Sequence, residues 1–504
     1  MGKKKVIRGG QLVDLAKGSA EPADILIVDD TIVEVGSSGM KVPEDASVID
    51  ASRRLMHPGL INAHTHGHGV LSKGMGDRWT LELLLNAAPW ISGGRLLEDK
   101  YLGTYVGAIE MLMKGTTAAY DLTAEFPLPT IDGIDACATA YADAGLRAVV
   151  APMVAEYSFY EAIPGLIDAV PTDLRAELDR FRPGAPEPCL AVLHQIATGW
   201  KHDTDWVRLA MAPTIPHHCG DDFMLGCKRI ADEFGLGLHS HVQESKVQVI
   251  TAMKTDGRTQ TAHLDHLGLL GPNFVVAHGV WLDADDMRRL GEHGASVAHN
   301  PGSNMRLGSG LADVRMMLEH GINVGIGTDG ANCSDNLNMY EGMRLSSLVS
   351  KCRGPDTERW LTTSEVAQAA TVGSAHALGF ERIGRIAKGF KADIVFLDLD
   401  HPNWMPLNQP TNQLVHTEDG TAVHSVMTGG TMRVENYRPV GIDMKRLAAK
   451  VEAARSRLHD TTHDSRALSE ALGKVVNIHC PGLAHEHYHV HRYGSPPAAE
   501  PSAK

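Results

Sequence analysis

The sequence predicts an α/β protein, a (β/α)8 TIM barrel with a small β-sandwich domain built from both chain ends. Two observations lead to this prediction. Across residues 58–382, short apolar or β-branched segments alternate with amphipathic helical segments, and eight strands can be counted. Residues 1–57 and 383–440 instead contain short strands separated by Gly and polar turns. A chain of 504 residues is long enough for a barrel and a satellite domain.

Each flanking segment is too thin to bury a core by itself. Residues 1–57 predict a small antiparallel β-module, and residues 383–440 return to the same pattern. Pairing of the two segments would give one sheet domain with a shared core. We therefore expect the first part of the β-sandwich domain at 1–57 and its second part at 383–440.

Residues 58–382 supply the barrel. The predicted strands are 60–64, 116–121, 147–153, 208–214, 237–241, 273–278, 295–299 and 323–329. The helices expected between them include 97–114, 133–144, 222–234, 284–293 and 311–320. A last helix is expected at 364–379, with Ser364 as its N-cap and Gly379 at its end.

Residues 441–504 predict a helical, His-rich C-terminal extension. The charged segment 441–460 is typical of a helix, and a short later segment holds His479, His485, His487, His489 and His491. We interpret the last forty residues as a loosely ordered polar tail or an oligomer contact. A second metal site is the alternative.

Composition restricts the partners and the location. The chain has 47 basic and 61 acidic residues, and a net charge of -14 disfavours nucleic acid or an anionic membrane as a partner. No apolar run approaches the length of a membrane span, and the N-terminal residues lack the apolar segment of a secretory signal. Seven cysteines without CxxC spacing indicate reduced thiols. We predict a cytoplasmic protein with a small-molecule substrate.

Polar residues stand where the predicted barrel strands end. On a strand, residues two apart share a face, so His64 and His66 can point to one metal ion. The other strand-end residues are His217, His218, His239, His241, Glu244, His278, His299, Asn300 and Asp329. Imidazole and carboxylate groups in this number suit Zn²⁺ or Fe²⁺. Because barrel enzymes hold their chemistry at these ends, the pattern predicts an active site there.

Five sequence motifs carry a family resemblance: PGLINAHTH at 58–66, LHSHVQE at 238–244, AHGVWL at 277–282, AHNPGSN at 298–304 and GTDG at 327–330. With them, residues 5–437 resemble the amidohydrolase superfamily. The similarity is to its mononuclear-metal branch, which contains S-adenosylhomocysteine, guanine and cytosine deaminases and triazine hydrolases. The resemblance implies a distorted barrel, and relatives of this kind are commonly homodimers or larger homo-oligomers.

The resemblance also implies the roles of the site residues. His64, His66, His241 and Asp329 would bind one divalent metal ion, zinc or alternatively iron, which makes hydroxide available near neutral pH. Glu244, His278 and Asp329 would be the catalytic residues, with Glu244 protonating the substrate ring and then the leaving amine. Binuclear relatives carry a lysine at the end of strand 4. Here that strand ends in MAPTIPHH (211–218), so we expect a single metal.

The implied reaction is hydrolytic deamination of an N-heterocycle such as a purine, pterin, pyrimidine or triazine. Hydrolysis of an amide, urea or chloro substrate at the same metal site is the alternative. A non-catalytic binding protein that keeps an inherited barrel is a third hypothesis, and the complete set of ligands and acid/base groups argues against it. His217, His218 and Trp79 are the expected substrate-binding residues.

Overall fold

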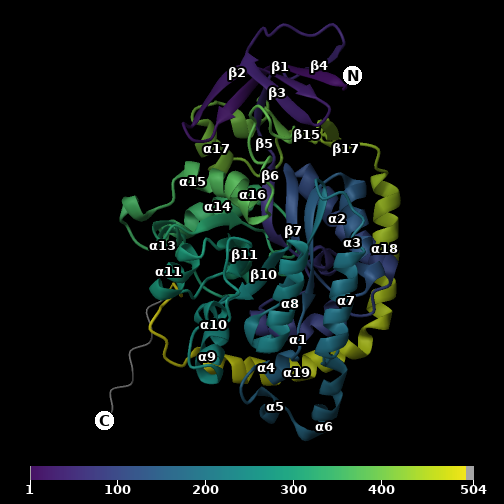
Figure 1. Cartoon of the computed structure of the whole chain (residues 1–504), viewed down its shortest axis with the longest axis vertical. Coiled ribbons are helices and arrows are strands. Elements are labelled where there is room, and N and C mark those ends of the chain that lie inside the picture. The colour runs from purple at the N-terminus through teal and green to yellow at the C-terminus, as the bar shows by residue number, and fades with distance from the viewer. Residues whose placement is uncertain (1, 495–504) are drawn as a thin grey trace.

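The computed structural model describes residues 2–494, which form a sheet domain and a barrel surrounded by helices. Figure 1 shows the sheet domain at one end of the molecule, with strands from the beginning of the chain beside strands from residues 394–439. The barrel and its helices make up the larger body beneath it. The predicted barrel and the predicted contribution of both chain ends to the second domain are confirmed.

The sheet domain is one mixed nine-stranded sheet. Its strands are β1 (Lys4–Asp14), β2 (Ser19–Val28), β3 (Thr31–Ser37), β4 (Ala46–Asp50), β5 (Arg54–Pro58), β14 (Ile394–Asp398), β15 (Val423–Thr428), β16 (Thr431–Glu435) and β17 (Arg438–Pro439). The two halves join where β5 pairs antiparallel with β14. The expected all-antiparallel arrangement of the first half was wrong, because β1 pairs in parallel with both β4 and β5.

The barrel strands follow one another in parallel. They are β6 (Leu60–Thr65), β7 (Thr116–Ala124), β8 (Arg147–Val154), β9 (Val207–Pro213), β10 (Gly237–Val242), β11 (Phe274–His278), β12 (Ser296–His299) and β13 (Asn323–Ile326). Nearly every residue of these strands is buried, which explains their continuous apolar composition. The register brings the carboxyl ends of all eight strands to one face of the barrel.

A side chain closes the seam between β13 and β6, for which no strand ladder is present in the described part of the chain. The amide of buried Asn62 donates to Thr328 Oγ1 at 2.7 Å, and the Thr328 N–H donates back to Asn62 Oδ1 at 3.0 Å. The next N–H, that of Asp329, donates to the His64 carbonyl at 2.9 Å. Two short polar segments are thereby held together without a regular pair of strands.

Helices cover the outside of the barrel and extend beyond it. Their bounds are α1 (Leu81–Ile91), α2 (Leu97–Met113), α3 (Ile131–Ala144), α4 (Phe159–Ala162), α5 (Leu166–Ala169), α6 (Thr172–Arg175), α7 (Pro186–Thr198), α8 (Asp221–Phe234), α9 (Lys246–Thr255), α10 (Gln260–His266), α11 (Ala284–Glu292), α12 (Pro301–Arg306), α13 (Val314–Glu319), α14 (Met339–Lys351), α15 (Thr363–Gln368), α16 (Ser374–Ala377), α17 (Pro410–His416), α18 (Met444–Thr461) and α19 (His463–Ala484). The five helices predicted between the strands correspond to α2, α3, α8, α11 and α13, and their ends lie within about three residues of the predicted ones.

The helix expected at 364–379 differs from the prediction in two respects. Thr362, rather than Ser364, is the N-cap, because its hydroxyl accepts from the Glu365 N–H at 3.2 Å in a capping box. Ser364 instead donates to the Leu15 carbonyl. A π-helical turn at Ala369–Gly373 then divides α15 from α16.

The C-terminal extension is more ordered than predicted. α18 begins after Asp443, whose side chain caps it, as the expected helix at 441–460 required. The prediction of a loosely ordered tail was wrong for residues 463–494. α19 is a long helix with a buried apolar face, and the segment after it lies against the barrel. The remaining residues of the predicted tail, 495–504, lie outside the described part of the chain.

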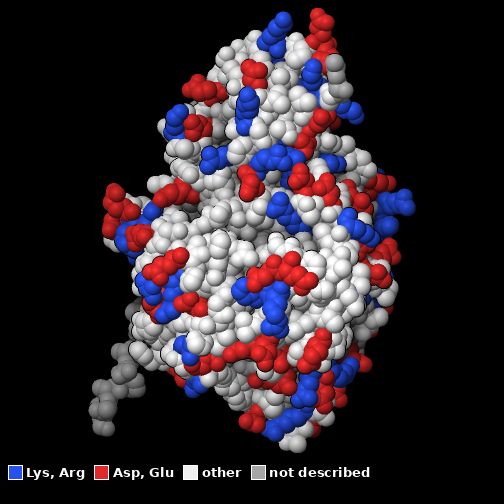
Figure 2. Space-filling view, viewed as in Figure 1, with Lys and Arg blue, Asp and Glu red and all other residues white. Residues whose placement is uncertain are grey.

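The surface carries charges of both signs. In Figure 2, basic and acidic side chains are interspersed over the face shown, and neither sign forms one continuous patch there. Among residues 2–494, no helix combines the length and the apolar character needed to cross a membrane.

Candidate active site

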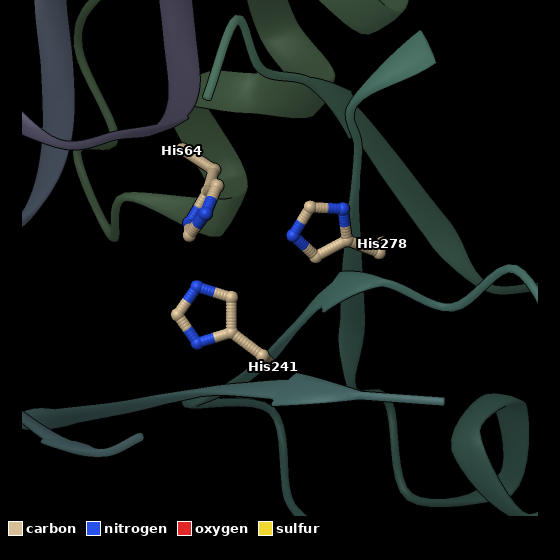
Figure 3. A group of neighbouring side chains, drawn as sticks. All are labelled: His64, His241 and His278. Atoms are coloured by element: carbon tan, nitrogen blue, oxygen red, sulfur yellow. The ribbon is translucent and has the colours of Figure 1, made fainter. Parts of the chain in front are cut away.

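Imidazoles from separate strands converge at the carboxyl end of the barrel. His64 lies on β6, His241 on β10 and His278 at the end of β11. Figure 3 shows these three rings directed toward a common centre, and ligand atoms of all three lie within 4.8 Å of one another. A second overlapping group joins His64 and His66 to Asp329 from the loop after β13. The residues predicted as metal ligands are therefore brought together.

The spacing of the donor atoms suits a small divalent cation. His66 Nε2 lies 3.3 Å from Asp329 Oδ1 and 3.3 Å from His241 Nε2, and His64 Nε2 lies 3.6 Å from the same carboxylate oxygen. Ligands at about 2.0–2.1 Å in a tetrahedral zinc site are about 3.3 Å apart. These four side chains can thus hold one ion without rearranging.

Hydrogen bonds behind two of the rings hold them in place. His66 Nδ1 donates to the Leu122 carbonyl at 2.6 Å, and His241 Nδ1 donates to the Thr214 carbonyl at 2.7 Å. Each bond leaves an Nε2 lone pair facing the centre of the site, which is the arrangement that orients histidine ligands in metalloenzymes.

Several polar atoms at this centre are buried without a hydrogen-bond partner in the described structure. They include both ring nitrogens of His64, His278 Nε2 and Glu244 Oε2. Burial, with the neighbouring imidazoles adding to it, lowers the pKa of His64 well below its usual value, so the ring is neutral. Orphaned neutral imidazoles beside a carboxylate fit a bound cation, because isolated polar groups of this kind are costly to bury. The site is therefore a divalent-metal site.

The pKa values of two carboxyl groups in the site are shifted in opposite directions. Burial, together with the charges of Asp329 and Glu82, raises the pKa of Glu244 well above its usual value. At Asp329 burial acts in the same direction, but the electrostatic effect of the neighbouring His66 and His278 imidazoles outweighs it and holds the pKa below its usual value. The environments of these two carboxyl groups thus shift their pKa values apart, which is the division of roles that acid/base catalysis needs.

Local backbone strain accompanies these residues. His278 and Asp329 have φ of 71° and 63°, and Gln243, which precedes Glu244, has φ of 51°. Non-glycine residues in this left-handed region are uncommon and persist where surrounding contacts hold them. Gln243 follows β10 directly, His278 is the last residue of β11, and Asp329 lies three residues beyond β13, so all three are at or near strand ends.

A cavity of about 580 Å³ opens from the donor cluster. Its polar end is lined by His66, His241, Glu244, His278 and Asp329, and His218 lies on its wall. Its apolar walls come from α1 and from the segments around residues 126–129 and 157–160. This volume accommodates a heterocycle with a substituent.

Two of the three predicted substrate-binding residues lie outside this cavity lining. Trp79 packs edge-on against Trp90, with ring centroids 6.1 Å apart, as part of an apolar cluster. His217 turns toward α10, where its Nδ1 accepts from Gln260 Nε2 at 2.7 Å. Only His218 reaches the cavity, since His217 and His218 are adjacent in a short turn and point in different directions.

Two lining residues were missed by the sequence analysis. His68 is buried on the cavity wall, and its Nδ1 accepts from the Ala124 N–H at 3.2 Å, so the proton of the neutral ring is on Nε2. The Arg95 guanidinium donates to the His68 carbonyl and to the Ile91 carbonyl. The signal for His68 was present, because it repeats the two-residue spacing of His64 and His66. Arg95 carried no comparable signal.

Lys201, the lysine nearest in sequence to the end of β9, lies far from this chemistry. Its side chain is exposed and pairs with Asp135 at 3.1 Å on the outer surface. This position gives no support to a bridging lysine.

An eight-stranded parallel barrel that carries a buried divalent-metal site and a carboxyl group of raised pKa at its strand ends defines a metal-dependent barrel hydrolase. The chain belongs to the amidohydrolase family, whose sequence model matches residues 55–433. Its enzyme class is accordingly that of hydrolases acting on non-peptide carbon–nitrogen bonds.

Relatives and solved structures agree with this family. The chain is 33% identical to a 5'-deoxyadenosine deaminase of Methanothermobacter thermautotrophicus, over 90% of this chain and 98% of the relative. It is 31% identical to a 5-methylthioadenosine/S-adenosylhomocysteine deaminase of Thermococcus onnurineus, over 84% and 92%. The fold is similar to a zinc-bound adenosine deaminase from Xanthomonas campestris (TM-score 0.80, 25% identity, 91% of this chain and 99% of that one). It is also similar to zinc-bound atrazine chlorohydrolase TrzN from Arthrobacter aurescens (TM-score 0.79, 26% identity, 90% and 100%).

Proposed function

We propose that this protein is a hydrolytic deaminase that replaces an amino group of an N-heterocycle by oxygen and releases ammonia. One observation carries the proposal: the Glu244 carboxyl group lies 3.5 Å from His278 Nε2, beside the donor cluster, and both groups are buried. A carboxyl group at this position can deliver a proton to a ring nitrogen of the substrate. The deaminase relatives support the same reaction class.

We assign His64, His66, His241 and Asp329 as ligands of a single ion and infer that the ion is zinc, with iron as the alternative. When bound there, the cation supplies a positive charge that lowers the pKa of water toward neutrality. The donor set of three imidazoles and one carboxylate supports this choice. The zinc-bound solved relatives support it as well.

The proton transfers are assigned to three side chains. Asp329 Oδ2, 3.7 Å from His278 Nε2, accepts the proton that water loses as its oxygen forms a bond to the amino-bearing carbon. His278 donates from Nδ1 to Asn304 Oδ1 at 2.8 Å, so its Nε2 accepts from the attacking water and orients it. Glu244 protonates the adjacent ring nitrogen. The proton held by Asp329 then reaches the amine. The carbon–nitrogen bond breaks as the remaining hydroxyl proton passes to the Glu244 carboxylate, so that a ring carbonyl forms, ammonia leaves and Glu244 is protonated again.

The cavity favours a substrate with a polar reacting ring and a largely apolar remainder. We assign His218 and His68 as polar contacts on the wall, because each lines the cavity. The leucines of α1 and the aromatic segment around residues 157–160 would surround the substituent.

An ammonia-release screen tests the proposal. Purified protein loaded with zinc, and separately with iron, is incubated with aminated purines, nucleosides, pterins, pyrimidines and triazines, and ammonia is measured enzymatically. At least one compound should release one ammonia per molecule converted. Metal-loaded protein that releases none across the panel would contradict the proposal.

Hydrolysis of a chloro, amide or urea substrate is the second candidate. It is favoured by the similarity to a solved atrazine chlorohydrolase, which has the same fold and also binds zinc. Parallel assays for chloride and for carboxylate products would separate it from deamination.

Assembly and location stay predictions. A homodimer or larger homo-oligomer is expected from the family and can be measured by light scattering. A cytoplasmic location is in keeping with the seven cysteines, all of them free thiols within the described residues.

A further inference from the structure

The chain continues past the family match, which ends at residue 433, into a segment that returns to the barrel mouth. We call residues 444–494 the C-terminal strap. In Figure 1, α18 runs along the barrel away from the sheet domain, and α19 crosses the opposite end of the molecule. α18 contacts α2, whereas α19 contacts α1, α5 and α9. The strap therefore spans the face on which the candidate active site opens.

The first strap contact supports the cavity wall formed by α1. Gly473 lets α19 approach closely, because a Cβ there would lie 3.3 Å from Asn86 Nδ2. The Asn86 amide donates to the Ser469 carbonyl at 2.9 Å, and its oxygen accepts from Tyr160 OH at 2.8 Å. Asn86 and Tyr160 both line the cavity. One buried amide thus joins the strap to two cavity walls.

An apolar core strengthens the same contact. Leu472, Val476, Cys480 and Leu483 on α19 are buried against residues of α4, α5 and α9. Since α9 begins directly after the loop that contains Glu244, this packing also fixes the wall next to the proposed proton donor.

The second strap contact lies behind His278. Arg492 is only 6% exposed, and its guanidinium donates to the Val280 carbonyl at 2.9 Å and to the Leu282 carbonyl at 2.7 Å. The Arg492 carbonyl in turn accepts from the Leu311 N–H at 2.8 Å. A single side chain from the end of the strap therefore holds the loop that immediately follows His278.

The loop after His278 also contacts the segment that carries Glu244. The Trp281 carbonyl, between the two oxygens bound by Arg492, accepts from Gln243 Nε2 at 3.0 Å. Gln243 precedes Glu244 and, like His278, has a positive φ. Because strained residues keep their conformation only under surrounding constraint, the guanidinium is placed to maintain the geometry of both.

We propose that the C-terminal strap is part of the active site: Arg492 is a positioning residue for His278 and Glu244, and α19 positions the α1 wall that determines which substituent is accepted. The proposal rests on the proposed deaminase function. The two contacts should affect different kinetic constants. The Arg492 contact supports the reacting groups and should affect kcat, whereas the α19 contact supports the cavity wall and should affect KM.

The Arg492 arm is tested with Arg492→Ala and Arg492→Lys, with the exposed Arg446→Ala as matched control. In Arg492→Ala, kcat should fall about 10–100-fold, because misplacement of catalytic groups by about 1 Å has effects of this size. KM should change less than about twofold and metal content not at all. Amides 279–282 should exchange hydrogen faster, and added guanidinium should restore part of kcat. Arg492→Lys keeps the charge but lacks the planar fork of the guanidinium, so its kcat should lie between those of Arg492→Ala and the wild-type enzyme.

The α19 arm is tested with Leu472→Ala, and Ile478→Ala is its control because Ile478 is 77% exposed on the same helix. Leu472→Ala should raise KM about 10-fold for a substrate with an apolar substituent, with kcat within about twofold. The unsubstituted heterocycle should be affected less. Equal effects on both substrates, or an unchanged KM, would overturn the proposed role of α19.

Failure of the strap proposal and failure of the deaminase function give different results. Hydrogen exchange at 279–282 and metal content are measured without substrate, so they decide on positioning even if no substrate is found. An active wild-type enzyme whose Arg492→Ala variant has normal kcat and normal exchange would overturn the proposal and leave the deaminase function standing. Should Arg492→Ala not fold, the same readouts on Arg492→Lys decide.

Discussion

Glu244 Oε2 and His278 Nε2 lie 3.5 Å apart, although the two residues are separated by a complete strand–helix unit of the barrel. They meet because β10 and β11 pair in parallel with Val242 opposite His278, so Glu244 extends beyond the strand end toward the ring. The Glu244 and His278 side chains are 2% and 1% exposed. Burial at this distance explains how a carboxyl group retains its proton beside a neutral imidazole.

Replacing Glu244 with Gln should reduce kcat by about 10²–10⁴-fold, the usual contribution of a positioned proton donor. The amide has the same shape but cannot transfer a proton, and Glu244 is outside the proposed ligand set. Metal content should therefore equal that of the wild-type protein, as measured by elemental analysis beside the ammonia assay. Glu435→Gln, at an exposed position of β16, is the control. A Glu244→Gln enzyme with near-normal kcat would remove Glu244 from the mechanism.

The activity should be lost at high pH as Glu244 loses its proton. Burial and the charges of Asp329 and Glu82 raise the pKa of Glu244, so its protonated form is present below that pKa and disappears as pH rises through it. Glu82→Gln removes one of these charges but keeps an oxygen to accept from Ser245 Oγ. The alkaline limb of the kcat profile should then move to lower pH. An alkaline limb that stays at the same pH, or moves to higher pH, would contradict the conclusion that the Glu82 charge raises the pKa of Glu244.

The Asn62 side chain should matter both for stability and for the metal site. Asn62→Ala leaves the buried Thr328 N–H without its acceptor, a loss of about 1–3 kcal/mol. Because Asp329 follows Thr328, its carboxylate should also become less well placed, and the metal should bind more weakly. Thermal unfolding of the metal-free protein and competition with a chelator measure the two effects separately. Weaker stability with unchanged metal affinity would limit Asn62 to a structural role.

The barrel and the donor cluster could be predicted because their signals are local. Buried parallel strands have continuous apolar sequences, and several of them end in or just before a polar residue whose position along the chain is easy to see. His64, His241 and Asp329 were identified in this way, and the parallel register then brings them to one face. The seam made by Asn62 and Thr328 could not be predicted, since nothing in either segment indicates a partner more than 260 positions away.

The substrate cavity and the strap depended on tertiary contacts. Trp79 was expected in the cavity from its loop position and His217 from its position in relatives, whereas packing on Trp90 and a bond to Gln260 direct them elsewhere. In α19 the apolar spacing from Leu472 to Leu483 is helical, but the histidines and the Pro/Ala/Ser end of the chain suggested a polar tail. Composition was misleading there because half of the helix surface remains exposed.

Stepwise addition of zinc to metal-free protein, with ammonia release followed on a substrate from the screen, tests the central claim most directly. We expect no activity without metal, a linear increase, and a plateau at one equivalent per chain. His66→Ala should neither bind the ion tightly nor gain activity, while keeping the circular dichroism of the folded barrel. Activity that is independent of added metal, or a plateau at two equivalents, would contradict a single-metal deaminase.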